Sequence, residues 1–346
     1  MPADPGEAAA AVASGMLLRA PVDSVERVHG FGRNSGVYRI RSGGASYALK
    51  QYPPRREGER DRAATEFGAL RFLAAHGIAP VPKALAADSE RGYALIEWID
   101  GDPVTAPSEA DIAAAAGFLG AIHALRSASD AAAQPMAAEA CLSAAEIVAQ
   151  IERRLARLDS IGASEPTLAT LLDGTARPLL VRIKDWAVAE YAARGLVFDQ
   201  PIAAAARTLC PADFGFHNAL RRSSGQLVFI DFDYFGWDDP VKLTADFLLH
   251  PGMPLPGSLK RQFAGAAAAI YQGDPGFGAR LALLYPLFAL RWCLILLNEF
   301  LPERWANRLN AGAEVDWEAA KQRQLDRGSE WMHSLATSFR WFPYGD

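Results

Sequence analysis

Cysteine is scarce in this sequence, with three among 346 residues. Cys141, Cys210 and Cys293 lie far apart, and they form neither a Cys-x-x-Cys pair nor a cluster with histidine. A disulfide framework would need an even set of cysteines, and a structural zinc site would need closely spaced ligands. The sequence therefore predicts neither feature, and it favours a reducing, cytoplasmic location.

An excess of positive charge is also missing. Lysine and arginine number 35 against 40 aspartates and glutamates, which gives a formal net charge of −5. A surface that binds nucleic acid or an anionic membrane needs a basic excess to hold phosphate groups. We therefore expect no nucleic-acid partner and no membrane partner.

The sequence has little uninterrupted hydrophobic chain. Its most apolar stretch, residues 281–301, is broken by Pro286, Arg291 and Glu299. A charge near the centre of a bilayer costs about 2.5–3.5 kcal/mol even on lenient scales. The stretch is therefore predicted to be a buried helix, or two helices bent at Pro286, rather than a membrane span.

Short β-rich segments fill the first hundred residues. We expect strands over residues 25–31, 36–41, 45–52 and 93–99, and one helix over residues 60–76. Because Pro21 follows an alanine-rich stretch, residues 1–20 are predicted to be a loosely held tail. Residues 21–100 would then form a small antiparallel-sheet domain with one helix.

Helical patterns dominate after residue 100. Helices are expected over residues 108–126, 143–158 and 183–194, and another is expected to begin at Asp239-Pro240. The predicted fold class is therefore α+β, with a mostly helical second lobe over residues 101–346. A small-molecule site is expected between the two lobes, because such sites favour domain interfaces.

The strongest functional signal is a hairpin inside the helical lobe. The chain reads LCPADFGFHN and then, after a turn at residues 223–225, VFIDFD. This hairpin pairs Leu220 roughly with Leu227, and it brings Asn218 close to Asp231 at its open end. Mg²⁺ prefers a few oxygen ligands from the protein, with the rest from phosphate and water. Asn218 and Asp231 are therefore predicted to hold Mg²⁺.

A third polar residue, Asp213, lies five residues before Asn218 on the loop that leads into the hairpin. There its carboxylate would receive or orient a hydroxyl proton near a metal-bound phosphate. Phosphoryl transfer depends mainly on positioning and charge neutralisation, so these groups suffice for it. Each carboxylate alone is as well explained by a turn, but the ordered set favours catalysis.

With its Asp-x4-Asn spacing followed by Ile-Asp-Phe-Asp, the chain resembles the aminoglycoside phosphotransferase and choline kinase family, relatives of the protein kinases. The resemblance covers about residues 25–340 and implies a bilobal, protein-kinase-like fold that uses ATP and Mg²⁺. It also implies that Asp213 is the catalytic base and that Asn218 and Asp231 bind the metal. Asp233 would be a further carboxylate on the metal side.

The chain departs from this family at two places. Pro211-Ala212 stand where the family usually has His-Gly before the catalytic aspartate. Leu243 stands where the family often has an aspartate, and Asp246 is expected to support the catalytic loop in its place. The loop as a whole resembles a bacterial branch of uncertain substrate.

A lysine on the third expected strand is the second signal. Lys50 is expected to face a cleft, where its charge would neutralise the α- and β-phosphates of ATP. Glu66 lies on the buried face of the following helix, and a half-buried glutamate needs a cation, for which Lys50 is the candidate. The alternative is a surface pair between Glu66 and Arg62, one turn earlier.

A glycine-rich link, HGFGRNSG, joins the first two expected strands. Its spacing is not GxGxxG and no helix follows, so it is not a Rossmann motif. A plain hairpin would explain the glycines, but the position before the Lys50 strand favours a loop that covers phosphates. Gly32, Asn34 and Ser35 are its expected contacts.

The segment EWID, residues 97–100, lies where the resemblance places the hinge between the lobes. Kinase-like folds bind adenine there through backbone groups, so Glu97 and Ile99 are expected nucleotide contacts. Of two nearby histidines, His123 is expected to be a core residue. His217 is expected to make a structural hydrogen bond rather than act in catalysis.

Three functions fit these residues. The favoured one is a Mg²⁺-dependent kinase that transfers the γ-phosphoryl group of ATP to a hydroxyl of an aminoglycoside-, amino alcohol- or sugar-like acceptor. The second is a kinase-like module that binds nucleotide without turnover, which Pro211-Ala212 leave open. A protein kinase ranks last, because the short segment between Asp231 and Asp239 leaves little surface to order a peptide.

Overall fold

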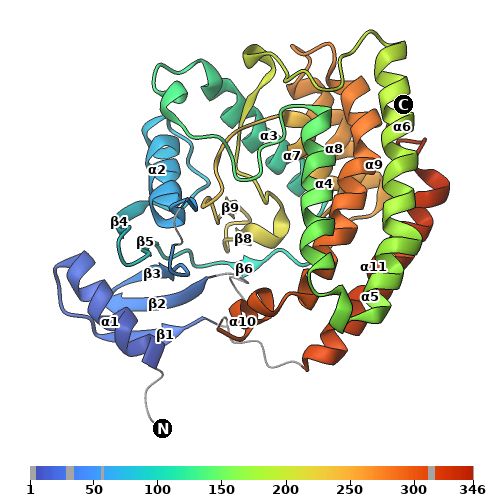
Figure 1. Cartoon of the computed structure of the whole chain (residues 1–346). Coiled ribbons are helices and arrows are strands. Elements are labelled where there is room, and N and C mark those ends of the chain that lie inside the picture. The colour runs from blue at the N-terminus through green and yellow to red at the C-terminus, as the bar shows by residue number, and fades with distance from the viewer. Residues whose placement is uncertain (1–4, 29–34, 56–57, 311–315, 346) are drawn as a thin grey trace.

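An antiparallel sheet and two helices build the N-terminal lobe (Figure 1). The structure is a computed structural model, and it describes residues 5–28, 35–55, 58–310 and 316–345. The strand order is β1-β2-β3-β5-β4, and all neighbours are antiparallel. The elements are α1 (Pro5–Leu18), β1 (Ser24–Arg27), β2 (Gly36–Ser42), β3 (Ala45–Gln51), α2 (Arg62–Ala75), β4 (Ala84–Asp88) and β5 (Tyr93–Glu97).

The two faces of this sheet have different partners, because side chains alternate along a strand. On the outer face, Leu49 of β3 packs in one cluster with Ala10 of α1. On the inner face, Ala48 and Ile96 join the core that includes α2 and the C-terminal lobe. Lys50, two residues after Ala48, therefore faces the C-terminal lobe. Figure 1 shows α1 and α2 on opposite sides of the sheet.

The prediction of a loosely held tail over residues 1–20 is wrong for the part that the structure describes. Residues 5–18 form helix α1, and its Ala10 and Ala13 are buried against the sheet. The helix contacts all five strands of the sheet. Its small alanine side chains allow close packing, and they give no stripe of large apolar residues that a sequence pattern would reveal.

Helices form most of the C-terminal lobe, on the other side of the molecule (Figure 1). They are α3 (Glu109–Ala124), α4 (Ala144–Asp159), α5 (Pro166–Leu171), α6 (Arg177–Ala193), α7 (Pro240–Leu249), α8 (Gly257–Ile270), α9 (Phe277–Leu296), α10 (Pro302–Asn310) and α11 (Trp317–Ser338). The expected caps are present, since Ser108 caps α3 and Asp239 caps α7.

Helix α9 is the centre of this lobe, where it contacts α4, α6, α7 and α11. It contains Pro286 within one continuous helix. Of the two arrangements predicted for residues 281–301, the structure has the single buried helix. Of the most apolar 18-residue window in this region, 83% is buried inside the protein, as in the core helix of a globular lobe.

The predicted hairpin is present between these helices. It consists of β8 (Ala219–Arg221) and β9 (Leu227–Phe229). Its register differs by one residue from the prediction, because Leu220 pairs with Val228 rather than Leu227. A short strand, β6 (Asp102–Pro103), pairs with β8, while β7 (Thr208–Cys210) pairs with β10 (Gly236–Asp238). These pairs fix both ends of the loop that carries Asp213.

The packing of α1 gives a testable prediction. Ala10→Asp would place an unpaired charge in a fully buried position, so we expect it to lower the free energy of unfolding by about 3 kcal/mol. Ala9→Asp, on the exposed side of the same helix, should change it by no more than about 0.5 kcal/mol. Urea denaturation measures both. Equal stability of the two variants would show that α1 does not pack on the sheet.

Candidate active site

One lysine joins the two lobes through two carboxylates. Lys50 Nζ on β3 lies 2.8 Å from Glu66 Oε1 on α2 and 2.6 Å from Asp231 Oδ1, just after β9. Glu66 is fully buried, and it also accepts hydrogen bonds from the Tyr52 hydroxyl and the Phe232 backbone N–H. The contact between Lys50 and Glu66 that the sequence predicts is therefore present.

The charge of Lys50 is fixed by these partners. Burial by itself would lower the pKa of Lys50, but the negative charges of Asp231 and Glu66 outweigh burial and hold its pKa well above the usual value. The ammonium group therefore stays protonated across the physiological pH range. It is a permanent positive charge beside the predicted metal carboxylate, where phosphate oxygens would bind.

Arg62 has a different partner from the one considered in the sequence. Its Nε donates to Asp233 Oδ2 at 2.6 Å, so the alternative pairing of Arg62 with Glu66 is wrong. Asp233 is 1% exposed, and burial together with the Asp231 charge raises its pKa to about 7 against the opposing effect of Arg62. Asp233 therefore links α2 to the segment that follows strand β9. We do not assign it to the metal.

Asp213, Asn218 and Asp231 follow one another around the open end of the hairpin. Asn218 Nδ2 donates to the Asp213 backbone oxygen at 2.9 Å, and the Ile230 N–H donates to the Asn218 backbone oxygen at 2.9 Å. The first of these bonds orients the Asn218 amide, so its Oδ1 is the end that would face a cation. The Asp231 side chain is 28% exposed, unlike the buried Glu66.

The backbone of this region is strained. Ala212, Asp213 and Asp231 have φ angles of 50°, 31° and 70°, in the left-handed region. A residue with a Cβ pays about 1–2 kcal/mol there, and such strain collects at functional sites. Ala212 stands where the resembled family usually has glycine, so this departure carries a conformational cost. Its N–H donates to Cys210 Sγ at 3.2 Å.

Two histidines contact the Asp213 carboxylate. Its Oδ1 lies 3.2 Å from His217 Nε2 and 3.5 Å from His250 Nε2. Burial alone would raise the pKa of Asp213, but the His217 hydrogen bond and the electrostatic effect of the nearby His217, His250 and Lys242 side chains hold it well below its usual range. The side chain is still 42% exposed, so it is an ionised carboxylate open to a ligand. The hydrogen bond expected of His217 is confirmed.

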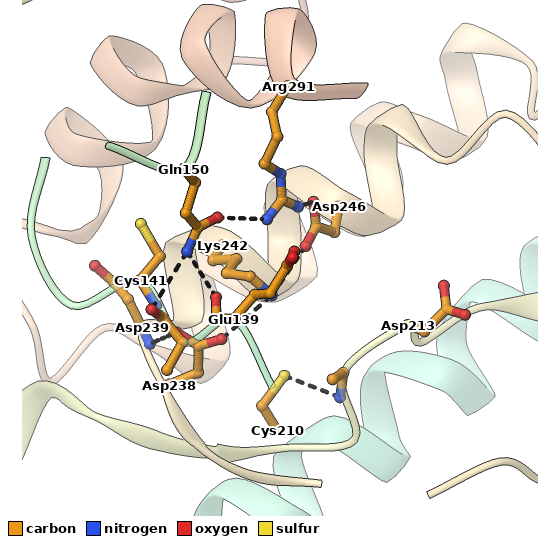
Figure 2. A network of polar contacts seen from close by, with 12 residues as sticks. Glu139, Cys141, Gln150, Cys210, Asp213, Asp238, Asp239, Lys242, Asp246 and Arg291 are labelled. Atoms are coloured by element: carbon orange, nitrogen blue, oxygen red, sulfur yellow. Dashed lines mark hydrogen bonds and ion pairs between the residues drawn. The ribbon is translucent and has the colours of Figure 1, made fainter. Parts of the chain in front are cut away.

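A buried network of charges lies beside the loop that carries Asp213 (Figure 2). Lys242 Nζ is 3.3 Å from Asp238 Oδ2 and 3.2 Å from Asp246 Oδ2, and Asp246 also accepts from Arg291. Asp238 in turn accepts the Cys141 backbone N–H at 2.7 Å. Because Asp238 ends β10 and β10 pairs with β7, the network holds the strand that leads into the loop.

Asp246 supports the loop at a distance rather than by contact. Figure 2 shows Asp213 standing apart from the charged network. Asp246 Oδ1 accepts from Trp292 Nε1 at 2.9 Å, and the Trp292 ring packs edge-on against His250 with centroids 4.9 Å apart. Leu243, which stands where the resembled family often has an aspartate, lies in the hydrophobic core with 2% of its surface exposed. His250 carries no sequence motif, and the sequence did not predict it.

The other predicted contacts belong to the glycine-rich link and to the end of β5. Gly32 and Asn34 fall outside the described residues, while Ser35 is 8% exposed just before β2. The Glu97 side chain is used within the protein, because its Oε1 pairs with Arg222 at 3.2 Å. Ile99 is 5% exposed. Any contact of Glu97 or Ile99 with a nucleotide would therefore come from their backbone groups.

His123 is half-buried rather than a core residue as expected, and its contacts are structural. Its Nδ1 lies 3.0 Å from Thr208 Oγ1, and its ring packs edge-on against Tyr271. Burial lowers the pKa of His123 to about 4, so the ring is neutral at physiological pH.

Comparison with known proteins gives one family and one fold. The model of the phosphotransferase enzyme family matches residues 25–283, while no curated protein sequence matches the chain. Choline kinase LicA from Streptococcus pneumoniae has a TM-score of 0.60 and 17% identity, covering 96% of this chain and 100% of its own. An ethanolamine kinase from Plasmodium vivax has a TM-score of 0.54 and 16% identity, covering 89% and 82%.

A spectinomycin phosphotransferase, solved with ADP and spectinomycin, has a TM-score of 0.57 and 13% identity, covering 97% of this chain and 99% of its own. At such identities these likenesses show the fold alone. The predicted protein-kinase-like architecture, with an antiparallel-sheet N-lobe and a helical C-lobe, is confirmed.

The buried pair gives a stability prediction. Lys50→Met leaves the Glu66 carboxylate buried without its cation, so we expect a loss of about 3 kcal/mol in the free energy of unfolding. Arg222→Met removes a partly exposed ion pair with Glu97 and should cost no more than about 1 kcal/mol. Urea denaturation compares the two. Similar losses would contradict the view that Glu66 depends on Lys50.

The strain at Ala212 gives a second prediction. Ala212→Gly should raise the free energy of unfolding by about 1 kcal/mol, because glycine adopts a positive φ without steric cost. Ala219→Gly, at a residue with φ of −133°, relieves no strain and should lower the free energy by about 1 kcal/mol. Thermal and urea unfolding report both signs. A loss at both positions would mean that Ala212 is not strained.

Proposed function

Because this chain belongs to the phosphotransferase enzyme family, we propose that it is a small-molecule kinase that transfers the γ-phosphoryl group of ATP to an acceptor hydroxyl. One observation carries the proposal. Asp213, Asn218 and Asp231 are linked around one end of a hairpin, and Asp231 contacts the fixed charge of Lys50. This is the set of groups that phosphoryl transfer needs, namely a proton acceptor, oxygen ligands and a cation for the phosphates.

The nucleotide would bind between the lobes. Lys50 would hold the α- and β-phosphates, Ser35 and the glycine-rich link would cover them, and the backbone at Glu97 and Ile99 would contact adenine. Two relatives support nucleotide use, since LicA has been solved with AMP and the spectinomycin phosphotransferase with ADP.

Asn218 and Asp231 fit Mg²⁺ as its protein ligands. Both offer oxygen atoms, which this hard cation prefers. The bond to Lys50 uses one oxygen of Asp231, and the bond to the Asp213 backbone turns the Asn218 amide so that its oxygen faces outward. When bound, Mg²⁺ would neutralise the phosphate charge that develops during transfer.

Asp213 would act on the acceptor. The hydroxyl oxygen forms a bond to the γ-phosphorus while the bond from that phosphorus to the bridging oxygen breaks, and ADP leaves. The hydroxyl proton passes to the Asp213 carboxylate. The low pKa of Asp213 makes it a weak base, which suits a loose transition state in which positioning contributes more than proton abstraction.

The acceptor would be a small alcohol. Relatives with this fold act on choline, ethanolamine or spectinomycin, which all carry hydroxyl groups. The strained Ala212 favours one second candidate, a kinase-like module that binds nucleotide without turnover. A screen of ATP consumption with choline, ethanolamine, spectinomycin, gentamicin and simple sugars distinguishes the two. MgATP binding without any phosphorylated product would support the second.

The roles of the two aspartates can be separated. Asp213→Asn should lower kcat by at least about 100-fold and change the dissociation constant of MgATP by less than about threefold, because it removes the proton acceptor and no phosphate contact. Asp231→Ala should instead abolish Mg²⁺-dependent nucleotide binding, which calorimetry measures. Asp185→Asn, exposed on α6, is the control and should match the wild type. Full activity of Asp213→Asn would remove this residue from the mechanism.

A further inference from the structure

Two imidazole rings converge on one oxygen of the Asp213 carboxylate. We propose that His217 and His250 are positioning residues for Asp213: His217 donates its Nε2–H to Asp213 Oδ1, and His250, stacked on His217, holds its own Nε2 3.5 Å from the same oxygen. The second oxygen of Asp213 is then presented to the acceptor hydroxyl. The role in catalysis rests on the proposed function, while the arrangement of the protons does not.

The tautomer of His250 is set by the backbone around it. The Gly252 N–H donates to His250 Nδ1 at 3.1 Å, so Nδ1 carries the lone pair and the proton of the neutral ring is on Nε2. Glycine permits this approach, because a Cβ at position 252 would lie 2.9 Å from His250 Cε1. The protonated Nε2 lies 3.5 Å from Asp213 Oδ1, which is a polar contact longer than a hydrogen bond.

His217 reaches the same tautomer by a different route. Its Nδ1 is buried, and no residue in the described part of the chain makes a hydrogen bond to it. A proton on Nδ1 would be a buried donor without an acceptor, which is costly. A proton on Nε2 has an acceptor in Asp213 Oδ1 at 3.2 Å. The proton of His217 therefore belongs on Nε2.

A metal ion is the other reading of this cluster, since ligand atoms of Asp213, His217 and His250 lie within 4.8 Å of one another. The ring geometry opposes it. The two rings are stacked with centroids 3.7 Å apart and an interplanar angle of 8°. A coordinated metal lies near the plane of each imidazole, and two parallel planes share no such point. His250 Nε2 also carries the proton and so lacks the lone pair that a metal needs.

Neighbouring elements hold both rings in place. His250 follows α7, where the Trp292 ring from α9 packs edge-on against it. Three residues later, Met253 Sδ accepts the Phe216 N–H at 3.0 Å. A Cβ at Gly215 would lie 2.4 Å from that sulfur, so the two segments are in close contact. The segment that follows α7 is therefore packed against the loop that carries Asp213, next to the two histidines.

Two substitutions of His250 test the positioning role. His250→Phe keeps a ring to stack on His217 but removes the donor, so we expect kcat to fall about 10- to 100-fold while KM for ATP changes less than about twofold. His250→Gln keeps a donor nitrogen near the place of Nε2 and an acceptor for Gly252, so it should retain kcat within about threefold. His333→Phe, exposed on α11, is the matched control and should equal the wild type.

The kinetic outcomes are decisive in both directions. Wild-type kcat in His250→Phe overturns the proposal, and so does a glutamine variant as slow as the phenylalanine variant, because that would show a purely structural need for the histidine. Circular dichroism and urea unfolding of both variants identify any loss of fold. The acceptor is whichever of choline, ethanolamine and spectinomycin the wild type phosphorylates.

An NMR experiment separates this inference from the proposed function. Long-range ¹H–¹⁵N spectra of protein labelled in histidine should show His217 and His250 as Nε2–H tautomers, with no change on adding equimolar Zn²⁺. Nδ1–H tautomers or zinc-shifted His250 signals overturn the inference. If the expected tautomers appear but no acceptor is phosphorylated, the kinase assignment fails while the paired donors at Asp213 stand.

Discussion

The architecture depends on one ammonium group held between two carboxylates. Lys50 comes from the sheet, Glu66 from α2 and Asp231 from the hairpin of the other lobe. Glu66 is fully buried, and a carboxylate removed from water is costly without a positive partner. The three segments must therefore meet at one point. That point lies where the lobes face each other, so the contact that joins the lobes also places a cation between them.

The loop that carries Asp213 receives a second kind of support from the helical lobe. Strand β7 leads into the loop and pairs with β10, and strand β8 follows the loop and pairs with β9. The charged network around Lys242 holds β10 through Asp238. Buried charges are costly to remove from water, and they are stable only when each has its partner in place. This requirement favours one arrangement of α7 and α9 over others. The charged side chains around Lys242 therefore hold the loop in place without contacting it.

Much of the site could be predicted from the sequence because its determinants are local. Asp213 and Asn218 are five residues apart on one loop, and the hairpin turn brings Asp231 back beside them. Lys50 and Glu66 could be paired because each lies at a regular position on its own strand or helix. For Lys50 and Glu66, strand or helix periodicity limits where the side chain can point.

The remaining features depend on contacts that no local pattern records. Asp231 and Asp233 look equivalent in the sequence, and only the position of Arg62 separates them. His250 reaches Asp213 because α7 ends there, and it lies 33 residues after His217 in the chain. The hairpin register differs by one residue from the predicted one because three residues, 223–225, lie between Arg222 and Gln226, which share a backbone hydrogen bond. Helix α1 was missed because alanine packs closely without an apolar stripe.

The order in which helices α9 and α11 are synthesised has a consequence for biogenesis. Helix α9 is apolar enough to resemble a membrane span, and part of its surface is covered by α11. The contact is close, since a Cβ at Gly328 would lie 3.6 Å from the Cys293 carbonyl oxygen. A growing chain thus exposes this apolar helix until residues 317–338 have left the ribosome. During that interval the uncovered part of α9 is a surface that promotes aggregation.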